Sequence, residues 1–264
     1  MIGIIGAGNM GMAIASGMRH RVLVSDIDSS KLRLVKNILI SIASNNIELA
    51  RRSDIIILAV KPQDIKTVLK EIRPYVKTKL IISIAAGVKT GFIEGFLGKV
   101  RVVRVMPNMP AVVGKGISAI TGGRFTAKND FKIATGIFSK LGEVVEVREG
   151  MMDAVTAVSG SGPAYYFLFT YLLQKAAEAN GLKKDLAEKM AIATFAGAAA
   201  IAKSKGLSME ELIKKVASKG GTTEAALTIF GKRKLEAIIK EAVKQAMHRS
   251  KQLYTLTMSE CKVV

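Results

Sequence analysis

The chain is poor in the side chains that most enzymes use as nucleophiles or metal ligands. Its 264 residues contain no tryptophan, two histidines (His20 and His248) and one cysteine, Cys261. A single cysteine excludes an intramolecular disulfide framework and a cysteine metal cluster. The sequence has no GxSxG elbow, and two histidines leave little scope for a catalytic triad. We therefore expect no metal site, and we expect the reactive chemistry to come from a bound cofactor that the protein positions.

The chain also lacks an uninterrupted apolar run of membrane-spanning length. The uncharged stretch at residues 154–174 is broken by Ser159-Gly160-Ser161-Gly162-Pro163, so it predicts a buried core helix rather than a membrane span. The first strand starts at residue 2, which leaves no room for a signal peptide and predicts a cytoplasmic protein.

Negative charge is scarce as well: 40 lysines and arginines face 21 acidic residues, for a formal net charge of +19. The basic residues are spread along the chain rather than gathered in one block, and aromatic residues make up only 5%. This distribution favours a solvated cationic surface that attracts anionic cofactors and substrates, and we expect no nucleic-acid partner.

What the chain does have is a glycine-rich turn at its start. A short apolar strand at residues 2–5 is followed by a GxGxxG segment and then by an apolar helical pattern. The three glycines would permit a tight turn, close approach of a pyrophosphate and close helix packing. An ordinary glycine-rich turn is the alternative. The predicted cofactor-binding residues here are Gly6, Ala7, Gly8, Asn9, Met10 and Gly11.

Apolar strand-like runs alternate with helical segments through the first half of the chain. Continuous Val, Ile and Leu runs are typical of strands covered on both faces, and the alternation predicts an α/β fold with a doubly wound, mostly parallel sheet. The predicted strands are residues 2–5, 22–25, 39–42, 55–60, 80–84 and 102–106, with weaker candidates at 117–120 and 144–147.

The second half changes to helical punctuation, because no proline follows Pro163. Ser208-Met209-Glu210-Glu211 is a capping box, and an apolar helical stripe runs from Leu235 to Met247. We place a Rossmann domain at residues 1–150 and an all-α dimerisation and substrate-binding domain at 151–264. The stripe and an alanine-rich helix at 190–202 favour burial against a second subunit, although a core within one chain is the alternative.

Further loops follow the predicted strands at their carboxyl ends, where open α/β sheets bind ligands. They add to the predicted cofactor site Ala59, Val60, Lys61 and Pro62, then Ala85, Ala86 and Gly87, then Asn108. Between two helices of the second half, residues 218–223 offer backbone N–H groups, hydroxyls and a helix N-terminus suited to a carboxylate. We expect Ser218, Gly220, Gly221 and Thr222 to bind a substrate carboxylate. A glycine C-cap followed by a threonine N-cap is the alternative for this loop.

Taken together, these segments resemble the pyrroline-5-carboxylate reductase family in order and spacing, over nearly the whole chain. The most specific are Ser-Gly-Ser-Gly-Pro-Ala-Tyr at 159–165 and Gly-Gly-Thr-Thr at 220–223. The resemblance implies NAD(P)H-dependent reduction of 1-pyrroline-5-carboxylate to L-proline by a homodimer or higher homo-oligomer with an active site shared between chains. It also implies a catalytic role for Thr223, whose hydroxyl would hydrogen-bond the ring nitrogen. A related imine or β-hydroxyacid reductase and a non-catalytic dinucleotide sensor remain alternatives.

The chain departs from many relatives at two points. Met109 stands where a threonine is usual, and Ser25-Asp26-Ile27 stands where many relatives read Ser-Asn-Arg. Asp26 lies at the end of the second predicted strand, where an acidic residue typically accepts hydrogen bonds from the adenosine ribose and repels a 2′-phosphate. We therefore expect NADH to be favoured over NADPH. A helix-capping role for Asp26 or Asp28, or phosphate binding by the serines and basic residues at 29–33, would remove that preference.

Overall fold

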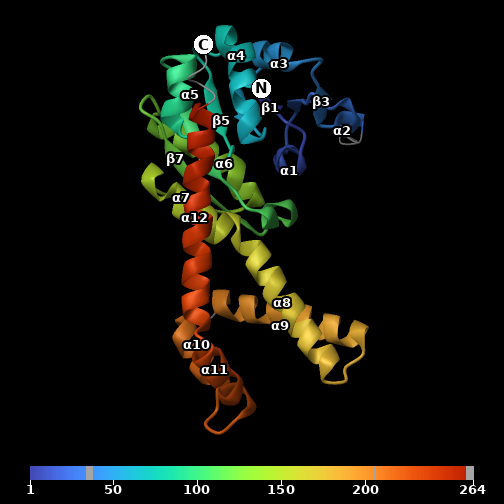
Figure 1. Cartoon of the computed structure of the whole chain (residues 1–264). Coiled ribbons are helices and arrows are strands. Elements are labelled where there is room, and N and C mark those ends of the chain that lie inside the picture. Colours follow the sequence, from blue (N-terminus) through green and yellow to red (C-terminus); the bar gives the residue numbers. More distant parts are fainter. Residues whose placement is uncertain (34–37, 205, 260–264) are drawn as a thin grey trace. The chain divides into compact units, whose positions relative to one another are not determined.

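The computed structural model describes residues 1–33, 38–204 and 206–259. Figure 1 shows the order of the elements along the chain. The chain forms two compact units: the first comprises Met1–Ser161 and Gln245–Val264, and the second comprises Gly162–Lys244. The expected boundary lay near Gly150, whereas residues 151–161 and 245–259 belong to the first unit.

The first unit is built on a sheet with the order β3-β2-β1-β4-β5-β6-β7-β8 in the described part of the chain. Strands β1 to β6 run parallel, β7 is antiparallel to β6, and β8 is parallel to β7. This confirms the predicted doubly wound, mostly parallel sheet. The strands are β1 (Ile2–Ile5), β2 (Val22–Ser25), β3 (Ile40–Ile42), β4 (Ile55–Leu58), β5 (Leu80–Ser83), β6 (Arg101–Met106), β7 (Gly116–Gly122) and β8 (Gly142–Glu146).

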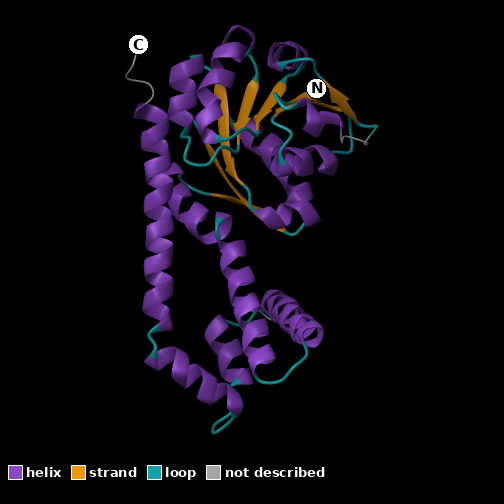
Figure 2. Ribbon diagram, turned by 45° about the vertical axis from the view of Figure 1, so that its right-hand side comes forward, coloured by secondary structure: helices purple, strands orange, loops and turns teal. Residues whose placement is uncertain are grey.

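Helices lie on both faces of this sheet (Figure 2). The α-helices of the first unit are α1 (Asn9–Gly17), α2 (Ser29–Arg33), α3 (Asn46–Arg52), α4 (Ile65–Ile72), α5 (Thr90–Leu97), α6 (Lys128–Phe138) and α7 (Met152–Val155). Shorter helical turns are η1 (Pro62–Asp64), η2 (Arg73–Tyr75), η3 (Met109–Val113), η4 (Ser139–Leu141) and η5 (Glu149–Met151), and η6 (Thr156–Gly160) is a π-helix.

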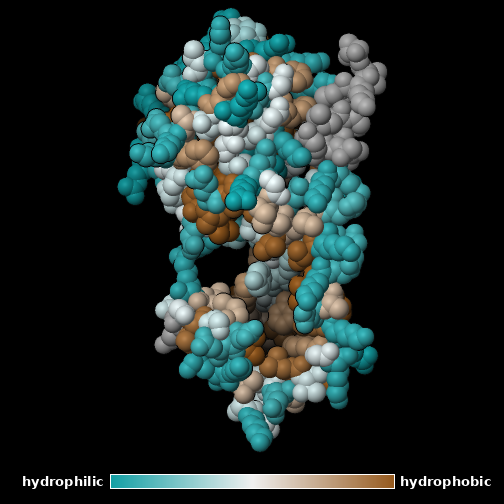
Figure 3. Space-filling model, turned by 90° about the vertical axis from the view of Figure 1, so that its left-hand side faces the viewer, coloured by the Kyte–Doolittle hydropathy of each residue, from teal (hydrophilic) through white to brown (hydrophobic). Residues whose placement is uncertain are grey.

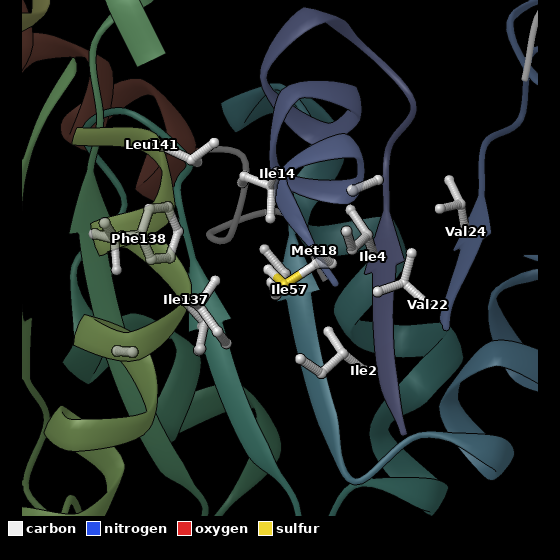
Figure 4. Packing of buried hydrophobic residues seen from close by; sticks show 14 of the residues in the cluster. Ile2, Ile4, Ile14, Met18, Val22, Val24, Ile57, Ile137, Phe138 and Leu141 are labelled. Atoms are coloured by element: carbon white, nitrogen blue, oxygen red, sulfur yellow. The ribbon is translucent and has the colours of Figure 1, made fainter. Parts of the chain in front are cut away.

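Two apolar cores result, one on each face of the sheet. On one face, α1 and α6 direct side chains such as Ile14 and Phe138 onto Ile4 and Ile57 (Figure 4). On the other face, α3, α4 and α5 pack on strand residues that include Ile56 and Ile81. Because the central strands are covered on both sides, their sequences read as continuous apolar runs rather than as alternating ones.

The second unit is helical. It contains α8 (Gly162–Ala179), α9 (Lys184–Ser204), α10 (Met209–Val216), α11 (Thr222–Lys232) and the start of α12 (Leu235–Ser259). The capping box of α10 is confirmed: Ser208 Oγ accepts the Glu211 N–H at 3.2 Å, and Glu211 Oε2 accepts the Ser208 N–H at 2.8 Å.

The expectation of a buried core helix at residues 154–174 is wrong for α8 within a single chain. Gly162 and Pro163 are its buried residues, whereas the large apolar side chains that follow are exposed. The cause is that α8 carries these side chains on all sides, so α9, which packs along it, cannot cover them all. In the described part of the chain, no helix combines the length and the apolar character that a membrane crossing needs.

Candidate active site

Four of the predicted cofactor segments lie along one edge of the sheet. Strands β1, β4, β5 and β6 are neighbours and run parallel, so their carboxyl ends meet at that edge. Gly6–Gly11, Ala59–Pro62, Ala85–Gly87 and the loop that contains Asn108 each follow one of these strands. This is the edge at which doubly wound sheets bind dinucleotides.

The glycine-rich turn has the geometry that its spacing predicts. Gly6 has φ +107°, and a Cβ there would lie 2.5 Å from the Ala59 carbonyl oxygen. A Cβ on Gly11 would lie 2.0 Å from the Gly6 carbonyl oxygen, so α1 can pack this closely only with glycine at that position. A Cβ on Gly8 would meet no atom of the chain within 4 Å, which leaves the backbone open on that side. The first and third glycines thus serve the fold, and the second leaves the turn open on one side.

Asp26 lies directly beside the glycine-rich turn. Its Oδ2 accepts the Ala7 N–H at 2.7 Å, and its Oδ1 accepts the Asp28 N–H at 2.8 Å. Lys31 Nζ approaches Oδ1 at 3.4 Å, and only 7% of the Asp26 side chain is exposed. The side chain accepts N–H groups from both neighbouring loops, so it holds the end of β2 against the cofactor turn.

The other edge segments are small or tightly turned. Lys61 precedes η1 in extended conformation, and Pro62 opens that turn, as its fixed φ favours. Ala85 and Gly87 are buried, and Gly87 has φ +76°. Their small side chains leave room above the carboxyl end of β5.

Asn108 lies in the loop that follows β6. Its Oδ1 accepts the Ile117 N–H at 2.9 Å, which ties the loop to the start of β7. Beside it lies an open pocket of about 900 Å³. Lys140 is the one charged residue that lines this pocket among the described residues, and Met109, at the position where a threonine is usual, is exposed at its wall. Residues from α1 and η3 form most of the lining, so the pocket offers shape and apolar surface rather than acid–base groups.

The predicted substrate loop lies in the second unit, between α10 and α11. Gly220 has φ +72°, Gly221 is the N-cap of α11, and Thr222 and Thr223 are the first two residues of that helix. The Gly220 N–H donates to Glu224 Oε2 at 2.7 Å, and the Gly221 N–H donates to the Ser218 carbonyl oxygen at 3.0 Å. One of the N–H groups expected to bind a substrate carboxylate therefore already binds a carboxylate of the chain itself.

The Ser-Gly-Ser-Gly-Pro segment continues the π-helix η6 into α8. Ser161 N–H donates to the Thr156 carbonyl oxygen at 2.9 Å, the wide pattern of a π turn. Such turns often occur at functional sites. A Cβ on Gly160 would lie 2.7 Å from Met106 Cε, the far end of a flexible side chain, so η6 lies close to the end of β6.

The sequence did not lead us to predict a buried charge cluster on strand β6. Arg104 is 2% exposed, and its Nη1 lies 3.7 Å from Glu149 Oε1. Burial lowers the pKa of the Arg104 guanidinium, and the charges of Glu149 and Asp153 partly oppose that shift. A charged residue inside the apolar run at 102–106 was the available signal. In the described part of the chain, no three histidine, cysteine or acidic residues are arranged to hold a metal ion.

Comparison with known proteins agrees with this geometry. Residues 149–253 match the family described as pyrroline-5-carboxylate reductase dimerisation, and residues 1–87 match the family described as NADP oxidoreductase, coenzyme F420-dependent. The pyrroline-5-carboxylate reductase of Methanosarcina acetivorans is 38% identical over 262 residues, covering 96% of this chain and 97% of the relative. The chain belongs to the pyrroline-5-carboxylate reductase family.

Other members are similarly close. The Pseudomonas aeruginosa pyrroline-5-carboxylate reductase is 36% identical, and the match covers 96% of both chains. The crystal structure of Plasmodium falciparum pyrroline carboxylate reductase with NADP bound has a TM-score of 0.87 and 32% identity, covering 96% of this chain and 97% of that one. The Coxiella burnetii pyrroline-5-carboxylate reductase structure has a TM-score of 0.88 and 35% identity over the same shares.

Proposed function

We propose that this chain reduces 1-pyrroline-5-carboxylate to L-proline with a nicotinamide dinucleotide. The observation that carries the proposal is the edge of the sheet at which the glycine-rich turn and three further predicted cofactor loops follow neighbouring parallel strands. The whole-length similarity to pyrroline-5-carboxylate reductases supports the choice of substrate.

The reaction needs positioning more than acid–base catalysis. A reduced nicotinamide held at this edge would supply a hydride to the imine carbon, and the imine nitrogen would take a proton. An imine carbon is electrophilic, especially when its nitrogen is protonated, so no covalent intermediate with the enzyme is required. The protein must hold the donor and acceptor carbons about 3–3.5 Å apart. This fits a site lined by small and apolar residues.

Each group of residues at the sheet edge would bind one part of the dinucleotide. The N–H groups at the start of α1, with Gly8 open beside them, would bind the pyrophosphate. Asp26 would accept hydrogen bonds from the adenosine ribose. Ala85–Gly87 and Asn108 follow the strands β5 and β6 and would border the nicotinamide.

The loop between α10 and α11 would bind the substrate carboxylate. Ser218, Gly220, Gly221 and Thr222 offer hydroxyl and N–H groups at the N-terminus of α11. The Gly220 N–H now donates to Glu224 Oε2, so a substrate carboxylate would have to replace that acceptor. The Thr223 hydroxyl would hydrogen-bond the ring nitrogen and orient it for protonation.

NADH is the preferred cofactor in this proposal. Asp26 is held beside the cofactor turn, and a carboxylate there repels the 2′-phosphate of NADPH. Two candidate phosphate ligands are already engaged: Ser30 donates to Asp28 through N–H and Oγ, and Lys31 lies near the Asp26 and Asp28 carboxylates. The opposing observation is the bound NADP in the Plasmodium falciparum relative.

The chain acts as a dimer in this proposal. The apolar side chains of α8, together with Ile238 and Ile239 of α12, are exposed in a single chain. Figure 3 shows such apolar surface, in brown, on the helical unit. Exposed apolar surface of this extent marks an association site. The match of residues 149–253 to a family described by dimerisation indicates a second copy as the partner.

Turnover with the cyclic imine tests the reaction. The purified chain should oxidise NADH when 1-pyrroline-5-carboxylate is added and should release proline. Oxidation with another imine or with a β-ketoacid, but not with this imine, would show a related reductase. Tight dinucleotide binding without turnover of any of these would show a sensor and overturn the proposal.

A further inference from the structure

Strand β6 carries two arginines, and each pairs with an acid that holds a helix N-terminus. Arg101 Nη1 lies 2.8 Å from Asp130 Oδ1, and Asp130 Oδ2 accepts the Ala127 N–H at the start of α6. Arg104 forms the second pair, with Glu149. Both are arginine–carboxylate pairs on β6. Asp130 accepts an N–H at the start of α6, whereas Glu149 accepts one at the start of α5.

The second pair holds the start of α5. Glu149 Oε1 accepts the Thr90 N–H at 2.7 Å, and Glu149 Oε2 accepts the Thr90 hydroxyl at 2.9 Å. Thr90 is the first residue of α5 and lies three positions after Gly87. Glu149 therefore fixes, through both donors of Thr90, the residue at which the chain enters α5 after the Ala85–Gly87 loop.

The two residues that Glu149 contacts are both buried. The Arg104 side chain is 3% exposed and Thr90 is 3% exposed, whereas the Glu149 side chain is 30% exposed. Nη2 of Arg104 has no hydrogen-bond partner among the described residues, so the guanidinium depends on nearby negative charge for its stability. Asp153, whose Oδ1 accepts the Ser250 hydroxyl at 2.7 Å, adds to that charge.

The same strand leads to the second loop of the nicotinamide region. Arg104 and Met106 lie on the same face of β6, since strand residues two apart share a face. Met106 contacts the π-helix at Gly160, and Asn108 follows two residues later. Contacts from residues 149–160 thus reach both the loop after β5 and the end of the strand that precedes Asn108.

We propose that Glu149 and Arg104 are positioning residues for the nicotinamide half of the cofactor. Glu149 sets the Ala85–Gly87 loop through Thr90, and Arg104 holds Glu149 in place from the strand that leads to Asn108. Neither residue is assigned a contact with the cofactor. This inference rests on the cofactor-binding part of the proposed function and not on the identity of the imine.

The test compares two ligands that share the adenosine half. NADH carries the nicotinamide and ADP-ribose does not, so the ratio of their dissociation constants isolates the nicotinamide region. In Glu149→Gln we expect NADH binding to weaken about five- to tenfold, the size of a lost charge-assisted hydrogen bond, with ADP-ribose binding nearly unchanged. The fluorescence of bound NADH should shift toward that of free NADH.

Asp130→Asn is the matched control, because it weakens the other arginine–carboxylate pair on β6, in which Asp130 is buried and the Arg101 side chain is 40% exposed. It should lower the melting temperature and leave the NADH to ADP-ribose ratio unchanged. Arg104→Lys, which keeps the charge, should restore part of the ratio that Arg104→Met loses, even if Arg104→Met folds poorly. If Glu149→Gln weakens both ligands equally, or behaves like Asp130→Asn, the inference is overturned. Because both ligands bind without substrate, a failure of imine turnover leaves this test intact.

Discussion

Asp26 is the residue at which cofactor preference can be tested most directly. The wild type should have the higher kcat/KM with NADH. Asp26→Asn should shift the NADH to NADPH ratio of kcat/KM toward NADPH by about tenfold, because it removes a charge that repels the 2′-phosphate. Steady-state kinetics with both cofactors measures this shift.

Asparagine has one acceptor oxygen where Asp26 now accepts both the Ala7 and the Asp28 N–H. The melting temperature of the variant therefore has to be checked beside its kinetics. A wild type that clearly prefers NADPH would show that the groups at residues 29–33 outweigh the carboxylate.

Thr223 is the residue that carries the proposed contact with the ring nitrogen. Thr223→Ala should lower kcat/KM for the imine by roughly 10²-fold if that contact strengthens in the transition state. Thr228→Ala is the matched control: its hydroxyl donates to the Glu224 carbonyl oxygen within the same helix, and its loss should leave kcat/KM near the wild-type value. Equal kinetics in wild type and Thr223→Ala would remove Thr223 from the mechanism.

At the scale of an element, substitutions at two glycines in the turn from β1 into α1 can separate an effect on stability from an effect on cofactor binding. Gly11→Ala places a Cβ 2.0 Å from the Gly6 carbonyl oxygen and should cost about 1–3 kcal/mol of stability or more. Gly8→Ala meets no atom of the chain and should leave the melting temperature unchanged. It should nevertheless weaken NADH binding by about tenfold, because its methyl group would stand where the pyrophosphate approaches.

Calorimetric melting and NADH titration of the two variants provide the comparison. If Gly8→Ala binds NADH as the wild type does, the open side of the turn is not the pyrophosphate site. The contrast between the two glycines would then report packing alone.

At the scale of the whole molecule, the exposed apolar surface of the helical unit predicts an obligate dimer. Tyr166→Glu and Ile238→Glu each place a charge on a side chain that is about 60% exposed in one chain. Each should dissociate the dimer, because burying an unpaired charge in an apolar interface is costly. Imine reduction should fall with it if the active site is shared between chains.

Sedimentation velocity measured beside activity tests this expectation. Lys70→Glu, an exposed change on α4 of the sheet unit, should keep both the dimer and the activity. A monomeric variant that retains full activity would contradict the shared site.

The sequence by itself determined the sheet and the edge of it at which the predicted cofactor loops lie. Short continuous apolar runs are typical of strands covered on both faces, and the glycine spacing at 6–11 permits a turn that other residues would block. The helical character of the second half was equally readable, because no proline follows Pro163 and capping residues such as Ser208 mark the helix starts. These features depend on local geometry and periodicity, which a sequence carries directly.

Only the tertiary structure decided which distant residues meet. Glu149 reaches Thr90 across 59 positions, and Asp153 reaches Ser250 across 97, so no local pattern could pair them. The exposure of α8 also could not be predicted from the sequence, because an apolar helix can have the same sequence whether it packs within its own chain or against a second chain. Contacts between residues far apart in sequence depend on how the elements pack together, and that is why the buried charges around Arg104 became visible only in the fold.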